Sequence, residues 1–236
     1  MKEKIIIATV KSWNIKNAFR FKELYKNKYE VIILDDKNKF EKEIIDSINP
    51  RWIFFPHWSW LIQPGFYTKY NCVLFHITDL PFGRGGSPLQ NLILRKIYNT
   101  KISAIKVTKE VDSGPIYIKE DFYIGLGSAN EIFSAASDLI FLKMIPFIIN
   151  KNPKPIEQIG EIISFKRRKP EESNIKLTNL KSLNDFYDFI RMLDGEAYPK
   201  AFIKFGKFKI EFSEVHKKND KVIGSFEIFE GDSNNE

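Results

Sequence analysis

The sequence predicts the α/β fold class, with a doubly wound, mostly parallel (Rossmann-like) sheet and a small α+β appendage towards the C-terminus. Over the first third of the chain, short apolar runs alternate with segments of helical spacing, as strands and helices do in such a sheet. The connections between these segments are short, which favours parallel strands joined by helical crossovers. After Ser182, one amphipathic segment is followed by alternating apolar and polar residues, the pattern of a small antiparallel sheet.

Continuous apolar runs predict the strands of the parallel sheet, because such strands are covered on both faces. These runs are residues 4–10, 30–34, 52–55 and 72–76. Apolar residues at helical spacing predict the helices between them, over 17–26, over 40–48 and from Pro64 onward. Ligands of doubly wound sheets lie at the carboxyl ends of the strands. We therefore expect the chemistry just after Phe55 and at or after His76.

The middle of the chain repeats these two patterns. They predict a helix over 88–98, strands over 102–108, 116–122 and 161–165, and a turn at 112–115. Ser128 and Glu131 have the spacing of a capping box. This pair predicts the start of a long helix that ends near Lys151.

The pattern also divides the chain into parts. These are a main domain at 1–165, a linker at 166–181, a helix with a small antiparallel sheet at 182–230, and a disordered tail at 231–236. In the third part, we expect the helix around 183–193 and strands over 201–205, 208–215 and 222–229. The aromatic residues of 202–212 suit a homodimer interface as well as a private core.

The composition excludes several classes of protein. With 236 residues, of which 43% are hydrophobic and 14% aromatic, the chain can bury a core and is not a largely disordered protein. No apolar run approaches the roughly 20 residues that span a bilayer, and the first residues lack a signal-peptide cleavage region. We therefore expect a cytoplasmic protein without a membrane partner. The single cysteine, Cys72, excludes an intrachain disulfide and a cysteine-rich zinc site, and no metal is expected.

The formal charge of +7 raises the question of a nucleic-acid partner. The basic residues are scattered among acidic ones, and only the run 166–169 forms a tight cluster. A scattered excess is more typical of a solvated surface, or of an anionic small substrate, than of an RNA groove. No nucleic-acid partner is expected.

The segment 74–88 (LFHITDLPFGRGGSP) carries the clearest functional signal. His76 ends a strand, and a turn rich in glycine and proline leads into the next helix. Gly85 and Gly86 allow a ligand to approach the backbone closely, as in an anion-accepting loop. The segment is not a P-loop, because the GxxxxGK[ST] spacing is missing.

This segment resembles the signature of the folate-dependent formyltransferases, His-x-Ser-Leu-Leu-Pro-x-x-x-Gly after a strand. The corresponding residues are His76, Thr78, Asp79, Leu80, Pro81 and Gly85. The Arg84-Gly85-x-x-Pro88 form is similar to that of the methionyl-tRNA and sugar formyltransferases. Residues 109–116 (KEVDSGPI) resemble the second signature of the family, Asp-x-Gly-x-Ile. The resemblance covers residues 4–165, so residues 1–165 are expected to form the catalytic domain.

The resemblance implies transfer of a formyl group from N10-formyltetrahydrofolate to a primary amine. It assigns His76 and Asp112 as catalytic residues. A histidine near neutral pH can stabilise the oxyanion that forms when the amine attacks. A carboxylate can orient that histidine and accept the proton that the nitrogen must lose.

One residue departs from the family pattern. The family has an asparagine two residues before the histidine, and this chain has Leu74 there. Leucine cannot hold an oxyanion, so either another donor replaces the asparagine or the protein binds its ligands without turnover. Candidate donors at the neighbouring strand end are His57, Trp58, Ser59 and Trp60.

The resemblance also implies where ligands bind. The pterin ring of the donor would be lined by Trp60, Leu61, Ile62, Thr78, Pro81, Thr108 and Asp112. The alternative is that the tryptophans simply bridge core and surface. A nucleotide-linked substrate would be bound by Lys11, Trp13, Asn14, Arg84 and Gly85. The alternatives are an ordinary loop capped by Asn14 and a surface ion pair of Arg84.

Three kinds of function follow from the resemblance. The sequence favours an acceptor that is a UDP- or dTDP-linked amino sugar of the 4-amino-6-deoxy type, in bacterial surface-glycan synthesis. This choice rests on chain length, on the small C-terminal sheet and on the Arg84-Gly85 loop. The alternatives are an enzyme like methionyl-tRNA formyltransferase, which usually has a larger basic C-terminal domain, and a non-catalytic folate- or nucleotide-binding protein.

Overall fold

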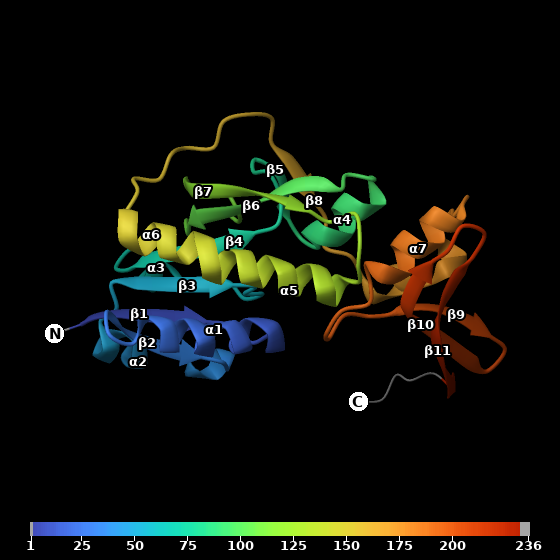
Figure 1. The fold of residues 1–236 in the computed structure, drawn as a ribbon, viewed down its shortest axis with the longest axis horizontal. Coiled ribbons are helices and arrows are strands. Elements are labelled where there is room, and N and C mark those ends of the chain that lie inside the picture. The colour runs from blue at the N-terminus through green and yellow to red at the C-terminus, as the bar shows by residue number, and fades with distance from the viewer. Residues whose placement is uncertain (1, 232–236) are drawn as a thin grey trace. The chain divides into compact units, whose positions relative to one another are not determined.

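The computed structural model describes residues 2–231, and the chain forms two compact units (Figure 1). The first unit comprises residues up to 85, 100–122 and 133–164. The second comprises 86–99, 123–132 and the chain from 165 onward. The sequence pattern places its boundary at residue 165, whereas two inner segments, 86–99 and 123–132, join the C-terminal region in the second unit.

The first unit is built on a six-stranded sheet in the order β2-β1-β3-β4-β6-β7. The strands are β1 (Glu3–Ala8), β2 (Tyr29–Leu34), β3 (Trp52–Pro56), β4 (Asn71–His76), β6 (Asn99–Lys106) and β7 (Ile116–Tyr123). The pairs among the first four are parallel, and β6 runs antiparallel to β4. The mostly parallel α/β class is thereby confirmed.

Successive residues of the buried strands enter two separate cores, which is why the strand sequences are apolar throughout. On one face, Ile5 and Ile7 of β1 pack with α1 (Ser12–Tyr25) and with residues 136–149. On the other face, Ile6 packs with Ile45 of α2 (Lys42–Ile48) and Phe66 of α3 (Pro64–Tyr67). Helix α1 begins at Ser12, five residues earlier than the apolar spacing predicts.

The long helix predicted after the capping box is present with one irregularity. It consists of α5 (Ala129–Leu139), a π-helical turn (Ile140–Met144) and α6 (Ile145–Lys151). The wide turn ends two residues before Pro146, which has no N–H to donate. Within the described residues, this is the one helix long and apolar enough to cross a bilayer, but half of its apolar window is buried inside the protein. The expected cytoplasmic location stays a prediction.

Strand β5 (Phe82–Gly85), which pairs with β8 (Ile163–Phe165), was not predicted from the sequence. The helix that follows it is shorter than its apolar spacing predicts. Helix α4 (Pro88–Leu94) ends before Arg95, and Lys96 has a φ of 59°. The apolar spacing up to Ile97 was therefore misleading, because the left-handed residue ends the helix.

The second unit contains α4, α7 (Leu183–Arg191) and a three-stranded antiparallel sheet. Its strands are β9 (Ala201–Phe205), β10 (Phe208–Lys217) and β11 (Val222–Glu230). The predicted linker carries two short 3₁₀ helices, Pro170–Ser173 and Ile175–Leu177. Of the predicted tail, all but Gly231 lies outside the described residues.

A buried arginine ties the second unit together. Arg191 is 1% exposed, and its Nε donates to Oδ1 of Asp188 over 2.8 Å. Its Nη1 donates to the carbonyls of Ile124 and Gly127 over 3.0 Å each. A buried guanidinium is tolerated when a carboxylate and carbonyl oxygens surround it. Arg191 thus fixes the turn at 124–127 to α7.

Candidate active site

His76 stands at the carboxyl end of β4, where the doubly wound sheet places chemistry. Its side chain is 8% exposed, and Nε2 lies 2.8 Å from the carbonyl oxygen of Gly83. Because a carbonyl can only accept, Nε2 must carry the proton and donate it. The second ring nitrogen, Nδ1, lies on the other side of the ring and faces Asp112.

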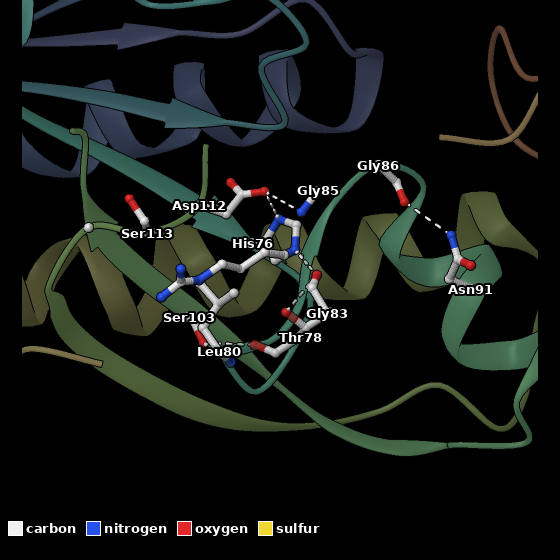
Figure 2. A network of polar contacts seen from close by, with 12 residues as sticks. His76, Thr78, Leu80, Gly83, Gly85, Gly86, Asn91, Ser103, Asp112 and Ser113 are labelled. Atoms are coloured by element: carbon white, nitrogen blue, oxygen red, sulfur yellow. Dashed lines mark hydrogen bonds and ion pairs between the residues drawn. The ribbon is translucent and has the colours of Figure 1, made fainter. Parts of the chain in front are cut away.

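Asp112 lies in the loop between β6 and β7, and its side chain points towards His76 (Figure 2). Oδ2 of Asp112 is 3.6 Å from Nδ1 of His76 and accepts the N–H of Gly85 over 2.9 Å. The residue is buried and has a φ of 53°, in the left-handed region. The structure thus brings together the two residues predicted to be catalytic. Their roles in catalysis stay a prediction.

The loop after His76 is held in place by the hydroxyl of Ser103, a residue that sequence reasoning missed. Oγ of Ser103 donates to the carbonyl of Thr78 over 2.7 Å and accepts the N–H of Leu80 over 3.4 Å. Oγ1 of Thr78 donates to the carbonyl of Gly83 over 3.4 Å, the same oxygen that holds His76 (Figure 2). Ser103 sits in an otherwise apolar strand, so only a search for polar residues at buried positions could have found it.

The loop that carries Asp112 is braced by its own side chains. Oγ1 of Thr108 and Oγ of Ser113 are 3.1 Å apart, and Oγ of Ser113 donates to the carbonyl of Glu110 over 2.9 Å. The chain then passes so close to β6 that a Cβ on Gly114 would lie 1.7 Å from the carbonyl oxygen of Lys106. Only glycine fits there.

Gln158 is a second residue that sequence reasoning missed. Its Nε2 donates to the carbonyls of Asp112 and Gly114 over 2.8 Å each. Its Oε1 accepts from Nε of Arg84 over 3.1 Å and from Nη2 over 2.7 Å. Gln158 lies outside helices and strands, and no motif marks it. Arg84, predicted to bind a substrate, is therefore also a partner of this amide.

Leu74, where the resemblance leads one to expect an asparagine, lies on the same face of β4 as His76. It is half-buried and packs with the core that contains Phe55 and the partly buried Trp58 and Ile62. Its carbons offer no hydrogen-bond donor. Of the candidate replacements, His57 has its ring edge against Trp13 and Phe133, at centroid distances of 5.8 and 4.9 Å.

The residues predicted to line the pterin pocket differ in exposure. Trp60 is 40% exposed and Leu61 is 84% exposed, whereas Ile62 is partly buried. The ring of Trp60 lies 4.9 Å from that of Trp58, edge to face. These side chains leave apolar surface open beyond the carboxyl end of β3, which suits a planar ring.

The residues predicted to bind a substrate near β1 begin α1. Lys11 is the N-cap residue, and the ring of Trp13 stacks on Phe133 at 5.5 Å. Asn14 is 2% exposed, and its Nδ2 donates to the carbonyl of Pro56 over 3.3 Å. Asn14 thus ties α1 to the end of β3, which the capping alternative did not foresee.

Comparison with known proteins supports one family. A family model of the C-terminal domain of methionyl-tRNA formyltransferase matches residues 170–229. A methionyl-tRNA formyltransferase of Clostridium botulinum is 26% identical in an alignment over 214 positions, which covers 83% of this chain and 68% of that protein. The chain spans 43–68% of the length of eight curated relatives that it matches.

Solved structures add the overall likeness. A sugar N-formyltransferase from Shewanella shares the fold, with 12% identity and a TM-score of 0.68 over 86% of this chain and 93% of that one. A methionyl-tRNA formyltransferase from Clostridium thermocellum is 53% identical, with a TM-score of 0.93, and the match covers 97% of this chain and 100% of that chain. The chain therefore belongs to the folate-dependent formyltransferase family, whose formyl donor is N10-formyltetrahydrofolate.

Proposed function

We propose that this protein transfers the formyl group of N10-formyltetrahydrofolate to a primary amine, with His76 and Asp112 as the catalytic pair. The observation that carries the proposal is the 3.6 Å approach of Oδ2 of Asp112 to Nδ1 of His76, while Nε2 is held by Gly83. The donor supplies an activated formyl carbon. The open apolar surface at Trp60 and Leu61 supports binding of its ring nearby.

The geometry assigns separate tasks to the two residues. Because Nε2 donates to Gly83, Nδ1 is free to take a proton from the amine nitrogen and to return it to the leaving nitrogen. The carboxylate of Asp112 stabilises the imidazolium that forms between these two transfers. Because this carboxylate faces Nδ1, it also orients the imidazole ring.

The oxyanion needs a donor, which Leu74 does not provide. A protonated Nδ1 of His76 can donate a hydrogen bond to the oxyanion. This charge-assisted hydrogen bond is stronger than one from the neutral side-chain amide of an asparagine. His76 therefore takes over part of the task of the family's asparagine. We expect the enzyme to depend on His76 more heavily than a relative with both groups.

For the acceptor, methionyl-tRNA is better supported than the nucleotide-linked amino sugar that the sequence favours. The support is the family model over residues 170–229 and the name of the relative with 53% identity. The sugar N-formyltransferase neighbour, at 12% identity, supports the fold alone. An RNA acceptor runs against the expectation of no nucleic-acid partner, which rested on scattered basic residues.

The amino sugar, of the 4-amino-6-deoxy type and linked to UDP or dTDP, is the second candidate. The observation that favours it is the ring of Trp13, which stacks on Phe133 and lies two residues after Lys11 in the chain. An aromatic platform and a lysine suit a nucleobase and its phosphates.

One experiment distinguishes these acceptors. The purified chain is incubated with N10-formyltetrahydrofolate and either methionyl-tRNA or a panel of UDP- and dTDP-linked amino sugars. Mass spectrometry then reports which acceptor gains a formyl group. We expect formyl-methionyl-tRNA. Product on a sugar alone would replace the acceptor, and folate binding without any product would favour the non-catalytic alternative.

A further inference from the structure

Gln158 uses its whole hydrogen-bonding capacity at one place. A glutamine side chain has two N–H donors and an oxygen that can accept twice. Both carbonyls that receive the N–H groups belong to the Asp112 loop, at Asp112 and Gly114, and both donors to the oxygen belong to Arg84. Replacing this amide leaves at least one of these partners without its bond.

The backbone around Gln158 is fixed on both sides although it is irregular. Before it, Ile156 pairs with Ile116 of β7 through two backbone bonds of 2.7 and 2.9 Å. After it, β8 pairs with β5, the strand that contains Arg84. The side chain of Gln158 is therefore presented to the Asp112 loop from a stretch that both sheets hold in place.

The contacts of Gln158 are part of a closed ring of contacts around the carboxylate of Asp112. The amide holds the main chain of Asp112, and the Asp112 side chain accepts from Gly85. Arg84, the residue before Gly85, donates in turn to Gln158, which completes the ring of contacts. Asp112 has a left-handed backbone, a strained conformation that persists only where surrounding contacts enforce it. The bond to its carbonyl is one such contact.

We propose that Gln158 is a positioning residue for the formyl transfer: it holds Asp112 at its working distance from His76, and Arg84 acts through Gln158. This proposal rests on the proposed function of the His76–Asp112 pair. Gln158 touches neither reacting partner. Its loss lets the Asp112 loop relax, so the carboxylate moves relative to Nδ1 of His76.

Two substitutions separate the bonds of Gln158 to the Asp112 loop from its bonds to Arg84. Gln158→Ala removes both sets of bonds. Gln158→Glu keeps oxygen acceptors for Arg84 but replaces the N–H donors with an oxygen that faces the carbonyls of Asp112 and Gly114. The matched control is Ile159→Ala, because Ile159 is the next residue and is 86% exposed.

The test measures kcat and KM with the acceptor that the product assay identifies. For both Gln158 variants we expect kcat to fall about 10- to 100-fold, as for misplaced catalytic groups, with KM for donor and acceptor unchanged and with the control at wild-type activity. Equal loss in the glutamate variant shows that the bonds to the loop matter. Wild-type kcat in either folded Gln158 variant, judged by circular dichroism and the melting temperature, overturns the proposal.

Arg84→Ala gives an independent arm. If Arg84 acts through Gln158, this variant lowers kcat and leaves the acceptor KM unchanged. A raised acceptor KM at unchanged kcat would mean that Arg84 binds the acceptor, and the proposal would fail. An inactive wild-type chain contradicts the proposed function instead. In that case, hydrogen exchange of residues 110–116 tests the inference directly, since faster exchange in Gln158→Glu supports it and unchanged exchange overturns it.

Discussion

Nδ1 of His76 and Oδ2 of Asp112 face each other across 3.6 Å, and each residue is held by a separate backbone group of β5. The carbonyl of Gly83 holds His76, and the N–H of Gly85 holds Asp112. The distance is beyond a good hydrogen bond, although both side chains are almost fully buried. The short strand β5 thus sets the geometry of both residues.

Replacing the imidazole is expected to abolish most turnover. His76→Asn removes the group that exchanges protons at Nδ1, and we expect kcat to fall by about 10²- to 10⁴-fold. The melting temperature is expected to change little, because an asparagine keeps an N–H donor at this position. His216→Asn is the control, since His216 is an exposed residue of β10. Full activity in the His76 variant would refute its assignment.

A methyl group at Gly114 is expected to destabilise the fold. Its Cβ would lie 1.7 Å from the carbonyl oxygen of Lys106, so the Asp112 loop must move away from β6. We expect Gly114→Ala to lower the free energy of unfolding by about 1–3 kcal/mol or more, measured by urea denaturation. Gly65→Ala, in α3 with open space around it, should be neutral or stabilising by about 0.5–1 kcal/mol. Equal changes in the free energy of unfolding for the two variants would contradict the steric clash at Gly114.

The capping box predicts a dependence of stability on pH. The N–H and the hydroxyl of Ser128 lower the pKa of Glu131 below its usual 4.5. Because the folded-state pKa is lowered, this stabilisation is present above pH 4.5 and is lost as the pH falls through the folded value. Denaturation of Glu131→Gln should therefore show a smaller loss of stability below pH 4.5 than the wild type. Parallel curves for the two proteins would contradict this.

The single thiol is expected to be inert in the folded protein. Cys72 is 1% exposed, and burial raises its pKa to about 12. The thiolate is the reactive form, so a disulfide reagent at pH 8 should modify the native chain far more slowly than the chain in denaturant. Absorbance of the released thiolate measures both rates. Immediate reaction of the native protein would show that β4 is accessible.

Much of the first unit could be predicted because its strands are covered on both faces. The runs around Ile5 and Phe54 are apolar for this reason, and these strand positions are confirmed. The capping box of Ser128 was also readable, because its two side chains are three residues apart. The family, the enzyme class and the formyl donor followed from the two short motifs around His76 and Asp112. These predictions are confirmed.

What the sequence did not reveal depends on contacts between distant segments. Strand β5 has the sequence FGRG and exists because β8 pairs with it. Gln158 gains its importance from Arg84 and Asp112, which lie far from it in the chain. The antiparallel direction of β6 follows from its pairing with β4, which no local pattern encodes. The acceptor stays a proposal, and the relatives support methionyl-tRNA better than the Arg84-Gly85 loop supports an amino sugar.

The interleaving of the two units limits how the protein can be divided. Helix α4 belongs to the second unit, yet it precedes much of the first unit in the chain, and Leu89 and Leu92 on it are fully buried. Gln90 of the same helix donates to the carbonyl of Met192. A fragment that ends at residue 165 lacks α7, so the apolar side chains of α4 would be exposed to solvent. Catalytic-domain truncations of this enzyme are therefore expected to aggregate.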